Sequence, residues 1–215
     1  YPLQKRTIDE AAICVSKIRQ TLGFNIPLML DLACPNDPNV SLKLAPLVKE
    51  FKPYWFEEPV DGEATRALKE IKNQTGLRIV TGEKQCGINH FIETLAVDAV
   101  DIFNPDISSV GGIIDMIKII ELSNKNNVRV SPHCWNSMSI AASAMVHLCM
   151  SFPNTEMAEF FPEYIPYTLK FCNKNFEINN GFIELDNREG LGVKIDTNLL
   201  MENTSSYKFS ILDKN

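Results

Sequence analysis

Six short apolar segments that recur about every 25 residues, with helical stretches between them, constrain the fold of this chain more than any other feature. Strands are expected near residues 26–32, 54–58, 77–83, 99–106, 128–133 and 155–160. Helices are expected near residues 7–22, 40–51, 63–74, 89–97, 112–124 and 138–150. Strands that alternate with helices over short connections run parallel and are joined by right-handed crossovers. The pattern therefore predicts an α/β protein built on a parallel sheet.

Such a sheet could be an open doubly wound sheet or part of a (β/α) barrel of the TIM type. We favour the barrel because the unit repeats without interruption and no glycine-rich phosphate-binding motif follows any strand. With about six β/α units the barrel would be incomplete. After residue 165 the pattern changes to a hairpin, a loop and a short helix near residues 198–202. We therefore predict a partial barrel at residues 1–165 and a separate C-terminal segment at residues 166–215.

A polar residue that can ionise closes each expected strand, and successive ones are 23 to 27 residues apart. In a closed barrel the carboxyl ends of the strands converge on one face, which is where such folds build their active sites. The regular spacing thus predicts one site made from all of these residues. They are Asp31, Glu57, Glu83, Asp106, His133 and Glu159.

Three of these residues, Asp31, Glu57 and Glu83, are acids at the ends of consecutive strands. Carboxylates crowded to about 4 Å repel one another by roughly 4 kcal/mol per pair at an effective dielectric constant near 20. Such a cluster must take up protons, separate or bind a cation, and oxygen ligands on rigid strands favour Mg²⁺. The alternative is that each acid only caps a helix or solvates a loop, but three matched positions favour a shared metal site.

Composition limits the partners of the protein. The net charge of -6 and the pI near 5.2 argue against nucleic acid or an anionic membrane as the main partner. No apolar run is long enough to span a bilayer. The six cysteines show no Cys-x-x-Cys spacing, so we expect reduced thiols and a cytoplasmic location rather than disulfides or a zinc site.

The stretches "LMLDL", "WFEEPV", "VTGEKQCG", "DIFNPDISSVGGI", "VSPHCWNS" and "GLGVKID" together resemble the mandelate racemase subgroup of the enolase superfamily. No single motif is specific, but their order and spacing match over nearly the whole chain. The resemblance implies a fragment of a barrel domain that holds its third to eighth strands. It also implies that the C-terminal segment would pack on a capping domain that is missing from the chain.

The same resemblance assigns roles to the residues at the strand ends. The first glutamate of "EEP" faces the barrel mouth in this family, so Asp31, Glu57 and Glu83 would bind Mg²⁺, while Glu58 would support the barrel wall. Asp106 and His133 would form a catalytic dyad, in which the aspartate fixes the tautomer of the imidazole and raises its basicity.

Glu159 would be the acid at the end of the eighth strand. It would donate a hydrogen bond to the substrate carboxylate if burial kept it protonated. Glu156 lies three residues earlier and competes for this role.

The chain departs from the family in two places. Where the family usually carries asparagine two residues after the first ligand, this chain has Ala33, so a contact is missing or has moved to Asn36 or Asp37. The lysine motif of the second strand is not visible and would fall just before Tyr1. As written, the chain would lack one catalytic base and much of the substrate lid.

The chemistry that the resemblance implies is removal of the proton alpha to a carboxylate, through an enediolate that Mg²⁺ stabilises. Dehydration of an acid sugar, an aldonate or aldarate, is the favoured outcome, with racemisation or epimerisation as the alternative. A non-catalytic structural or binding relative is a third reading. The partner would be a small carboxylate, and the family implies a homo-oligomer. Side chains beside the site either line the pocket or pack in loops: Lys84, Cys86, Cys134, Trp135 and Asn136.

Overall fold

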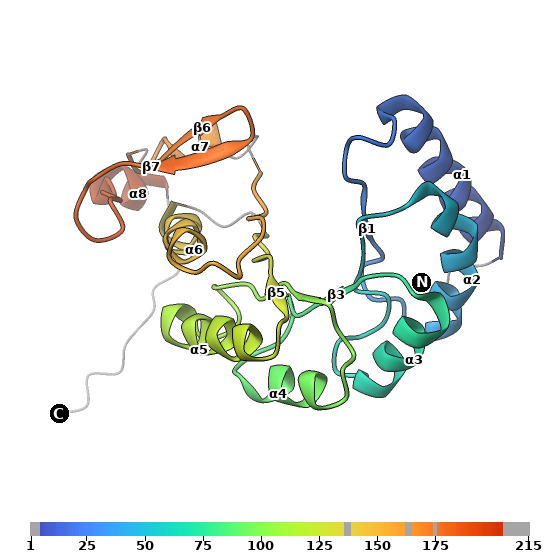
Figure 1. Ribbon diagram of the computed structural model, residues 1–215. Coiled ribbons are helices and arrows are strands. Elements are labelled where there is room, and N and C mark those ends of the chain that lie inside the picture. The colour runs from blue at the N-terminus through green and yellow to red at the C-terminus, as the bar shows by residue number, and fades with distance from the viewer. Residues whose placement is uncertain (1–4, 136–138, 162–164, 174–175, 204–215) are drawn as a thin grey trace.

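The fold is a curved parallel sheet with helices along its outer side, followed by a small antiparallel hairpin (Figure 1). The computed structural model describes residues 5–135, 139–161, 165–173 and 176–203. The parallel strands, in both chain order and sheet order, are β1 (Met29–Asp31), β2 (Trp55–Glu57), β3 (Ile79–Thr81), β4 (Ile102–Phe103) and β5 (Arg129–Val130). This confirms the predicted α/β class and its parallel, barrel-type sheet.

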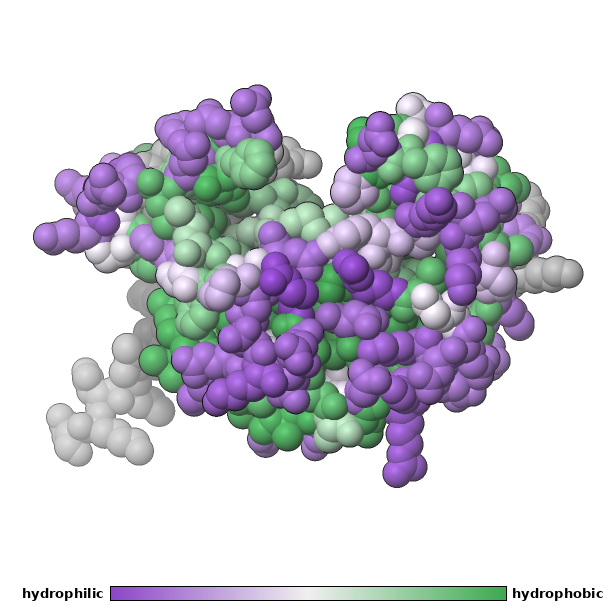
Figure 2. Space-filling view, in the orientation of Figure 1, coloured by the Kyte–Doolittle hydropathy of each residue, from purple (hydrophilic) through white to green (hydrophobic). Residues whose placement is uncertain are grey.

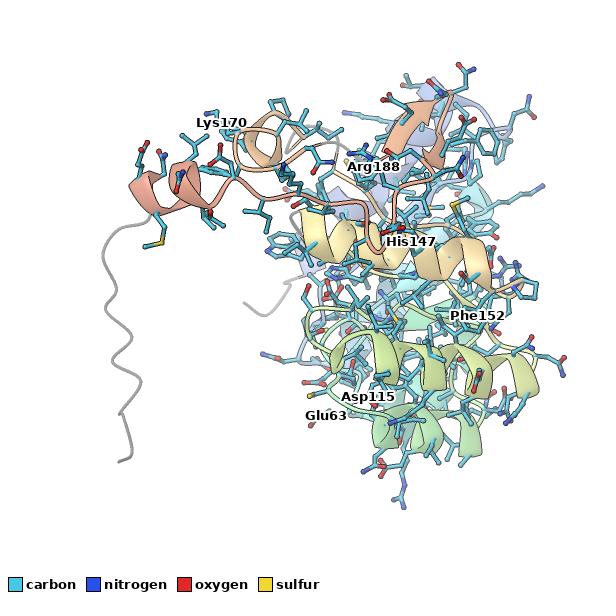
Figure 3. The ribbon with its side chains drawn as sticks, turned by 90° about the vertical axis from the view of Figure 1, so that its left-hand side faces the viewer. Glu63, Asp115, His147, Phe152, Lys170 and Arg188 are labelled. Carbon is cyan, nitrogen blue, oxygen red and sulfur yellow. The ribbon has the colours of Figure 1, made fainter. Side chains whose placement is uncertain are left out.

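Helices separate the strands as predicted. They are α1 (Lys5–Leu22), α2 (Pro38–Val48, continued by the 3-10 turn η1, Lys49–Phe51), α3 (Thr65–Thr75), α4 (Asn89–Ala96), α5 (Gly112–Lys125) and α6 (Ser139–Ser151). Figure 3 shows α6, α5 and α4 stacked as consecutive layers on the outer side, with His147 on α6 and Asp115 on α5. Among the described residues no helix is both long and apolar enough to cross a membrane.

Local sequence signals set the ends of these helices. Asp37 accepts a hydrogen bond from the backbone N–H of Asn39 at 2.9 Å and so caps α2, whose first residue is Pro38. Gly76 ends α3 in the left-handed conformation and returns its N–H to the carbonyl of Lys72. Asp37 is thus used as a helix cap and does not replace the asparagine that the family carries after its first metal ligand.

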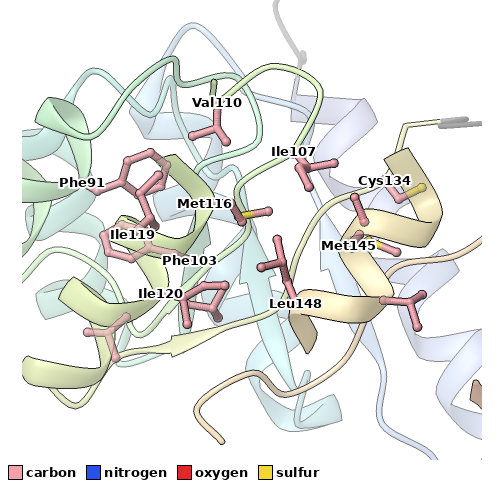
Figure 4. Packing of buried hydrophobic residues seen from close by; sticks show 14 of the residues in the cluster. Phe91, Phe103, Ile107, Val110, Met116, Ile119, Ile120, Cys134, Met145 and Leu148 are labelled. Atoms are coloured by element: carbon pink, nitrogen blue, oxygen red, sulfur yellow. The ribbon is translucent and has the colours of Figure 1, made fainter. Parts of the chain in front are cut away.

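The two faces of the sheet bury different clusters because side chains alternate along a strand. Phe56, Ile79 and Phe103 point outward and pack against the helices in two large hydrophobic clusters, one of which is drawn in Figure 4. Trp55, Val80 and Ile102 point inward and form a smaller cluster with Met29, Tyr54 and Met157. The inner face therefore has an apolar floor, and the next inward residue of each strand lies above it.

The prediction of a regular sixth strand at residues 155–160 is wrong. The segment forms one isolated bridge, between Val130 and Thr155, and one further backbone hydrogen bond, from the N–H of Glu159 to the carbonyl of Pro132 after β5. The reason lies in Pro132, which has no N–H to donate to this segment. The hydroxyl of Ser131 instead donates to the carbonyl of Met157 at 2.8 Å, so the ladder is interrupted but the carbonyl is satisfied.

The C-terminal segment contains the predicted hairpin and short helix. It comprises α7 (Ile165–Thr168), β6 (Phe176–Asn179), β7 (Phe182–Leu185) and α8 (Thr197–Asn203). Asn180 and Gly181 form the hairpin turn, both with positive φ, as a two-residue turn of this kind requires. The hairpin packs on α6 through Ile183 and Leu185, which join the hydrophobic cluster of that helix.

The two ends of the described chain stay on opposite sides of an opening. In Figure 1 α1 and the hairpin face each other across it, and the space-filling view shows the surface notched between them (Figure 2). All six cysteines lie in the described part of the chain, and none of them forms a disulfide, as expected from their spacing. The division into residues 1–165 and 166–215 stays a prediction.

Gly82, directly after β3, lies where the chain has a positive φ and packs closely against Phe91. Its φ is 135°, and an added Cβ would lie 3.0 Å from a ring carbon of Phe91. We expect Gly82→Ala to lower the free energy of unfolding by about 2 to 3 kcal/mol, because strain and overpacking add. Urea denaturation measures the loss.

Gly23→Ala is the matched control for this prediction. Gly23 also has a positive φ, of 72°, but nothing lies within 4 Å of the position that an added methyl group would occupy. The substitution should cost only about 1 kcal/mol, the usual penalty of the left-handed conformation. Equal losses in the two variants would contradict the role given to close packing at Gly82.

Candidate active site

A pocket of about 300 Å³ opens at the carboxyl ends of the parallel strands, above the apolar floor of the inner face. Every strand or strand extension from β1 to residues 157–159 contributes to it, except β3. Its lining residues are Met29, Asp31, Trp55, Glu57, Asn104, Ser131, Pro132, His133, Met157, Ala158 and Glu159. A concave site at this end of a parallel sheet is the usual place for small-molecule binding.

Asp31 and Glu57 are brought together by strand register. They are direct partners across the β1–β2 pair, so both carboxylates project to the inner side at the same height. The backbone N–H of Ala33 donates to Asp31 Oδ1 at 2.8 Å, and Asn104 Nδ2 donates to Glu57 Oε1 at 2.6 Å. Asp31 is exposed, whereas Glu57 is half-buried.

Glu83 reaches the same region by a different route. It follows Gly82, whose positive φ ends β3 and redirects the chain. Glu83 Oε2 lies 3.4 Å from His133 Nε2, and Glu83 Oε1 lies 3.6 Å from the ammonium of Lys84. Glu83 does not line the pocket itself but contacts a residue that does.

His133 and Asp106 form a close pair. The two residues are joined by a parallel bridge, and His133 Nδ1 lies 2.8 Å from Asp106 Oδ2. The backbone N–H groups of Ser108 and Trp135 also donate to the Asp106 carboxylate, at 2.7 and 3.3 Å. With Nδ1 held by Asp106, Nε2 is the imidazole nitrogen on the side of Glu83 and Glu159.

The pair changes the proton affinity of both partners. Burial of His133 lowers its pKa, but the hydrogen bond to Asp106 and the charges of Glu159 and Glu83 outweigh this effect and raise the pKa. Burial of Asp106 raises its pKa, but the bonds from His133 and the two backbone N–H groups outweigh it and lower the pKa. The imidazole is therefore made more basic while its partner stays ionised.

The two candidate glutamates beyond β5 have separate environments. Glu159 lines the pocket, accepts from the backbone N–H of Cys134 at 2.8 Å and lies 3.7 Å from His133 Nε2. Glu156 instead lies 3.6 Å from Arg129 and 3.8 Å from Arg78. The Glu159 side chain is 42% exposed, so the burial that its expected role as a proton donor required is not found.

Burial and the neighbouring carboxylates change the pKa of the acids in the site. Burial, together with the charges of Asp31, Glu159 and Glu83, raises the pKa of Glu57 to about 7, against a partly opposing effect of His133. Burial also raises the pKa of Glu83. A bound cation would remove this repulsion, and hard carboxylate oxygens on rigid strands are a donor set that suits Mg²⁺.

The three carboxylates suit a metal by their chemical type and by their position at adjacent strand ends, but they are not arranged around one point. In the part of the chain that the structure describes, no three His, Cys, Asp or Glu side chains lie close enough together to hold an ion as they stand. Asp31, Glu57 and Glu83 thus carry the right chemistry at adjacent strand ends, but their oxygens do not yet converge.

Several residues expected at the pocket lie elsewhere. Lys84, Cys86, Cys134 and Trp135 are not among its lining residues, and Trp135 is 69% exposed. Asn136 lies outside the described residues. Position next to a site residue in the chain was a poor guide, because these residues lie in the turns and loops after β3 and β5, where no strand alternation fixes the direction of a side chain.

Asn104 and Ser131 line the pocket but were not predicted from the sequence. The signal for Asn104 was present, since it lies two residues before Asp106 and two after the inward-pointing Ile102. Strand alternation alone would have placed it inside. The prediction considered only side chains that can ionise, whereas the amide of Asn104, which is 3% exposed and bonded to Glu57, also belongs to the site.

One further expectation concerns a residue away from the pocket. Glu58 is fully buried and accepts hydrogen bonds from Thr81 Oγ1 at 2.7 Å and from the backbone N–H of Gly82 at 3.0 Å. It therefore supports the wall between β2 and β3, as predicted. His90 and His147 lie in α4 and α6, outside the pocket.

Comparison with known proteins agrees with this arrangement. Residues 3–199 match the family described as enolase C-terminal domain-like. The D-galactonate dehydratase of Verminephrobacter eiseniae is 29% identical over 209 residues, which cover 92% of this chain and 53% of that protein. The chain thus spans about half the length of the curated relatives it matches.

Two crystal structures share the fold. An enolase from the environmental genome shotgun sequencing of the Sargasso Sea is 46% identical, with a TM-score of 0.89, and the match covers 93% of this chain and 53% of that one. A mandelate racemase/muconate lactonizing enzyme from Jannaschia sp. CCS1 is 25% identical, with a TM-score of 0.88 and coverage of 96% and 52%.

The raised pKa of Glu57 predicts how stability depends on pH. The folded protein holds this proton up to about pH 7, whereas an ordinary glutamate has a pKa of 4.5, so the metal-free protein loses stability as pH rises from about 4.5 to 7. Glu57→Gln keeps the acceptor for Asn104 and removes the titration. In EDTA, we expect its unfolding free energy relative to wild type to increase by roughly 2 kcal/mol between pH 5 and pH 8.

Urea denaturation at the two pH values measures this difference. Glu121→Gln, on the exposed side of α5, controls for the loss of one negative charge from the protein as a whole. Added Mg²⁺ should stabilise the wild type at pH 8 more than Glu57→Gln. A difference between Glu57→Gln and wild type that is the same at pH 5 and pH 8 would contradict the electrostatic account.

Proposed function

Because this chain belongs to the enolase C-terminal domain-like family, in the mandelate racemase subgroup of the enolase superfamily, we propose that it forms the catalytic half of an acid-sugar dehydratase. The reaction would begin with removal of the proton alpha to the substrate carboxylate. The observation that carries the proposal is the His133–Asp106 pair, which presents a basic imidazole nitrogen at the edge of a pocket lined by carboxylates. Aldonates and aldarates are the proposed substrate class.

His133 acts as the base. Its Nδ1–H is donated to Asp106, which leaves Nε2 with a lone pair, and that pair takes the alpha proton. Asp106 holds the ring in this tautomer and stabilises the imidazolium that forms. Glu83 and Glu159, at 3.4 and 3.7 Å from Nε2, add negative charge that favours the protonated ring.

The imidazolium then serves as the acid. In dehydration it gives its proton to the beta-hydroxyl, the carbon–oxygen bond breaks, and water leaves. The enol that remains takes up a proton from solvent at the beta carbon, loses its hydroxyl proton to solvent and becomes a 2-keto-3-deoxy acid. One proton is thus taken and one returned at His133, so the histidine ends the cycle in its starting state.

Asp31, Glu57 and Glu83 are the residues that would hold Mg²⁺. The ion, when bound, supplies positive charge against the substrate carboxylate as negative charge builds on its oxygens. The protein's own contribution is to present three hard oxygen donors from adjacent strand ends. Asn104 orients one of these donors by its bond to Glu57.

Racemisation or epimerisation is the second candidate, and the likeness to a mandelate racemase/muconate lactonizing enzyme favours it. The same base would start the reaction, but the proton would return to the opposite face of the substrate. A non-catalytic relative is the third. The hydrogen-bonded His133–Asp106 pair argues against it, because a purely structural barrel has no need to bury an imidazole and a carboxylate beside a pocket.

We further propose that the protein works in a reducing compartment such as the cytoplasm and assembles as a homo-oligomer. The first proposal is supported by six cysteines that are all thiols. The second is supported only by resemblance to the family.

The type of reaction can be measured on the intact protein with Mg²⁺ and a panel of aldonates and aldarates in deuterium oxide. We expect formation of a keto acid, detected as its semicarbazone. Deuterium uptake at the alpha carbon without a keto product would indicate the epimerase instead. Neither product from any acid of the panel would support the non-catalytic relative.

The role of His133 can be separated from that of the metal ligands. His133→Ala should reduce turnover by about 10²- to 10⁴-fold, the usual contribution of a general base. Because His133 is not a proposed ligand, Mg²⁺ binding measured by calorimetry should persist. His147→Ala, in α6 and outside the pocket, should retain full turnover, and loss of Mg²⁺ binding in His133→Ala would overturn the assignment.

A further inference from the structure

Two residues that line the pocket each have a buried polar atom without any hydrogen-bond partner among the described residues. These atoms are the indole Nε1 of Trp55 and the amide Oδ1 of Asn104. Both residues line the pocket, and they are 9% and 3% exposed. Buried polar groups are nearly always bonded, so each unbonded group in a native structure requires an explanation.

The two atoms have complementary chemistry. The indole nitrogen can only donate a hydrogen bond, and the amide oxygen can only accept one. The other end of the Asn104 amide is already fixed, because its Nδ2 donates to Glu57 Oε1 at 2.6 Å. The amide therefore cannot turn to bring a donor into the pocket without breaking that bond, and its oxygen is held as an acceptor.

A hydroxyl group is the simplest ligand group that can form a hydrogen bond with either atom. It has one hydrogen to donate and lone pairs to accept, whereas an ether or a ketone can only accept, and an alkyl chain can do neither. Two other lining residues, Met29 and Met157, are apolar and pack with Trp55 on the floor of the inner face, whereas Glu57, bonded to Asn104, is a carboxylate. A hydroxyl on an otherwise compact carbon chain fits such a lining.

We propose that Trp55 and Asn104 form a hydroxyl-binding subsite that makes the pocket selective for polyhydroxy acids over unsubstituted carboxylates. The proposal rests on the proposed function, since it concerns the substrate of the same site. In it, Trp55 Nε1–H donates to a substrate hydroxyl, and Asn104 Oδ1 accepts from one. Neither residue takes part in proton transfer, so both determine specificity rather than chemistry.

The first test needs no change to the binding residues. The chain has two tryptophans, Trp55 and Trp135, and Trp135 is 69% exposed, so Trp135→Phe identifies the Trp55 indole N–H resonance in the ¹H–¹⁵N spectrum of the intact protein. Gluconate, galactonate and galactarate are added separately, with hexanoate as a six-carbon acid without hydroxyls. We expect at least one of the hydroxy acids to shift this resonance strongly and hexanoate to leave it nearly unchanged.

The second test measures affinity in the His133→Ala background, where turnover is blocked. Trp55→Phe keeps the ring and removes only the donor, and Asn104→Leu removes the acceptor at similar volume. Trp55→Phe should weaken binding of the hydroxy acid by about 3- to 10-fold, the usual effect of one lost hydrogen bond, and leave hexanoate binding unchanged. Asn104→Leu also removes the bond to Glu57, so it should weaken binding of the hydroxy acid about 3- to 10-fold more than it weakens binding of hexanoate. Trp135→Phe is the matched control and should weaken neither.

The outcomes separate this proposal from the proposed function. Equal affinity for hexanoate and all three hydroxy acids, or equal losses for both kinds of acid in Trp55→Phe and Asn104→Leu, would overturn the subsite and indicate that water alone bonds the two atoms. If the wild-type protein makes no keto acid and takes up no deuterium, the proposed function fails. The subsite would still stand if the hydroxyl-dependent shift and losses were observed.

Discussion

A single buried carboxylate, that of Glu58, holds together the three strand ends on which the site depends. It is fully buried and accepts hydrogen bonds from Thr81 Oγ1, from the backbone N–H of Gly82 and from the thiol of Cys34 at 2.5 Å. Lys84 Nζ lies 2.8 Å from the same thiol and brings a positive charge near the buried acid. Burial and the bond to Glu58 raise the pKa of Cys34 to about 12, so the thiol keeps the proton that it donates. The donors come from the loop after β1 and from the end of β3, and Glu58 itself follows β2. Three elements are therefore tied at one point just outside the pocket.

This tie explains how the chain can keep so many acids near each other. Asp31, Glu57 and Glu83 each lie within two or three residues of a group that contacts Glu58, so they cannot move apart without breaking buried hydrogen bonds. The cost appears in the raised pKa of Glu57, which is due first to burial and then to repulsion from Asp31, Glu159 and Glu83. The pair of His133 and Asp106 lies across the pocket on the next two strand ends. Negative charge and a basic imidazole thus face one space, which is the arrangement that proton removal next to a carboxylate requires.

Most of the fold could be predicted from periodicity, because strand and helix patterns repeat with regular spacing. The departures have local causes that a pattern does not contain. The sixth strand became a single bridge because Pro132 has no N–H, and Ser131 supplies the missing bond to Met157 from its side chain. Glu159 was expected to be buried, but the chain around it leaves its side chain 42% exposed. Lys84, Cys86, Cys134 and Trp135 were expected either to line the pocket or to pack in loops, and none of them is among its lining residues.

The sequence by itself determined which ionisable residues come at the ends of the strands, because strand alternation and repeat length depend only on local covalent geometry. Strand alternation also required Glu57 and Glu58 to face opposite sides, and the resemblance to the family indicated which of the two faces the site. Only the tertiary structure decided which polar atoms are left without a partner, as with Trp55 Nε1 and Asn104 Oδ1, and how far the carboxylates are from convergence. Those properties depend on distances between strands that are far apart in the chain. Coulomb energy and hydrogen bonding change over fractions of an ångström, and no one-dimensional pattern records such distances.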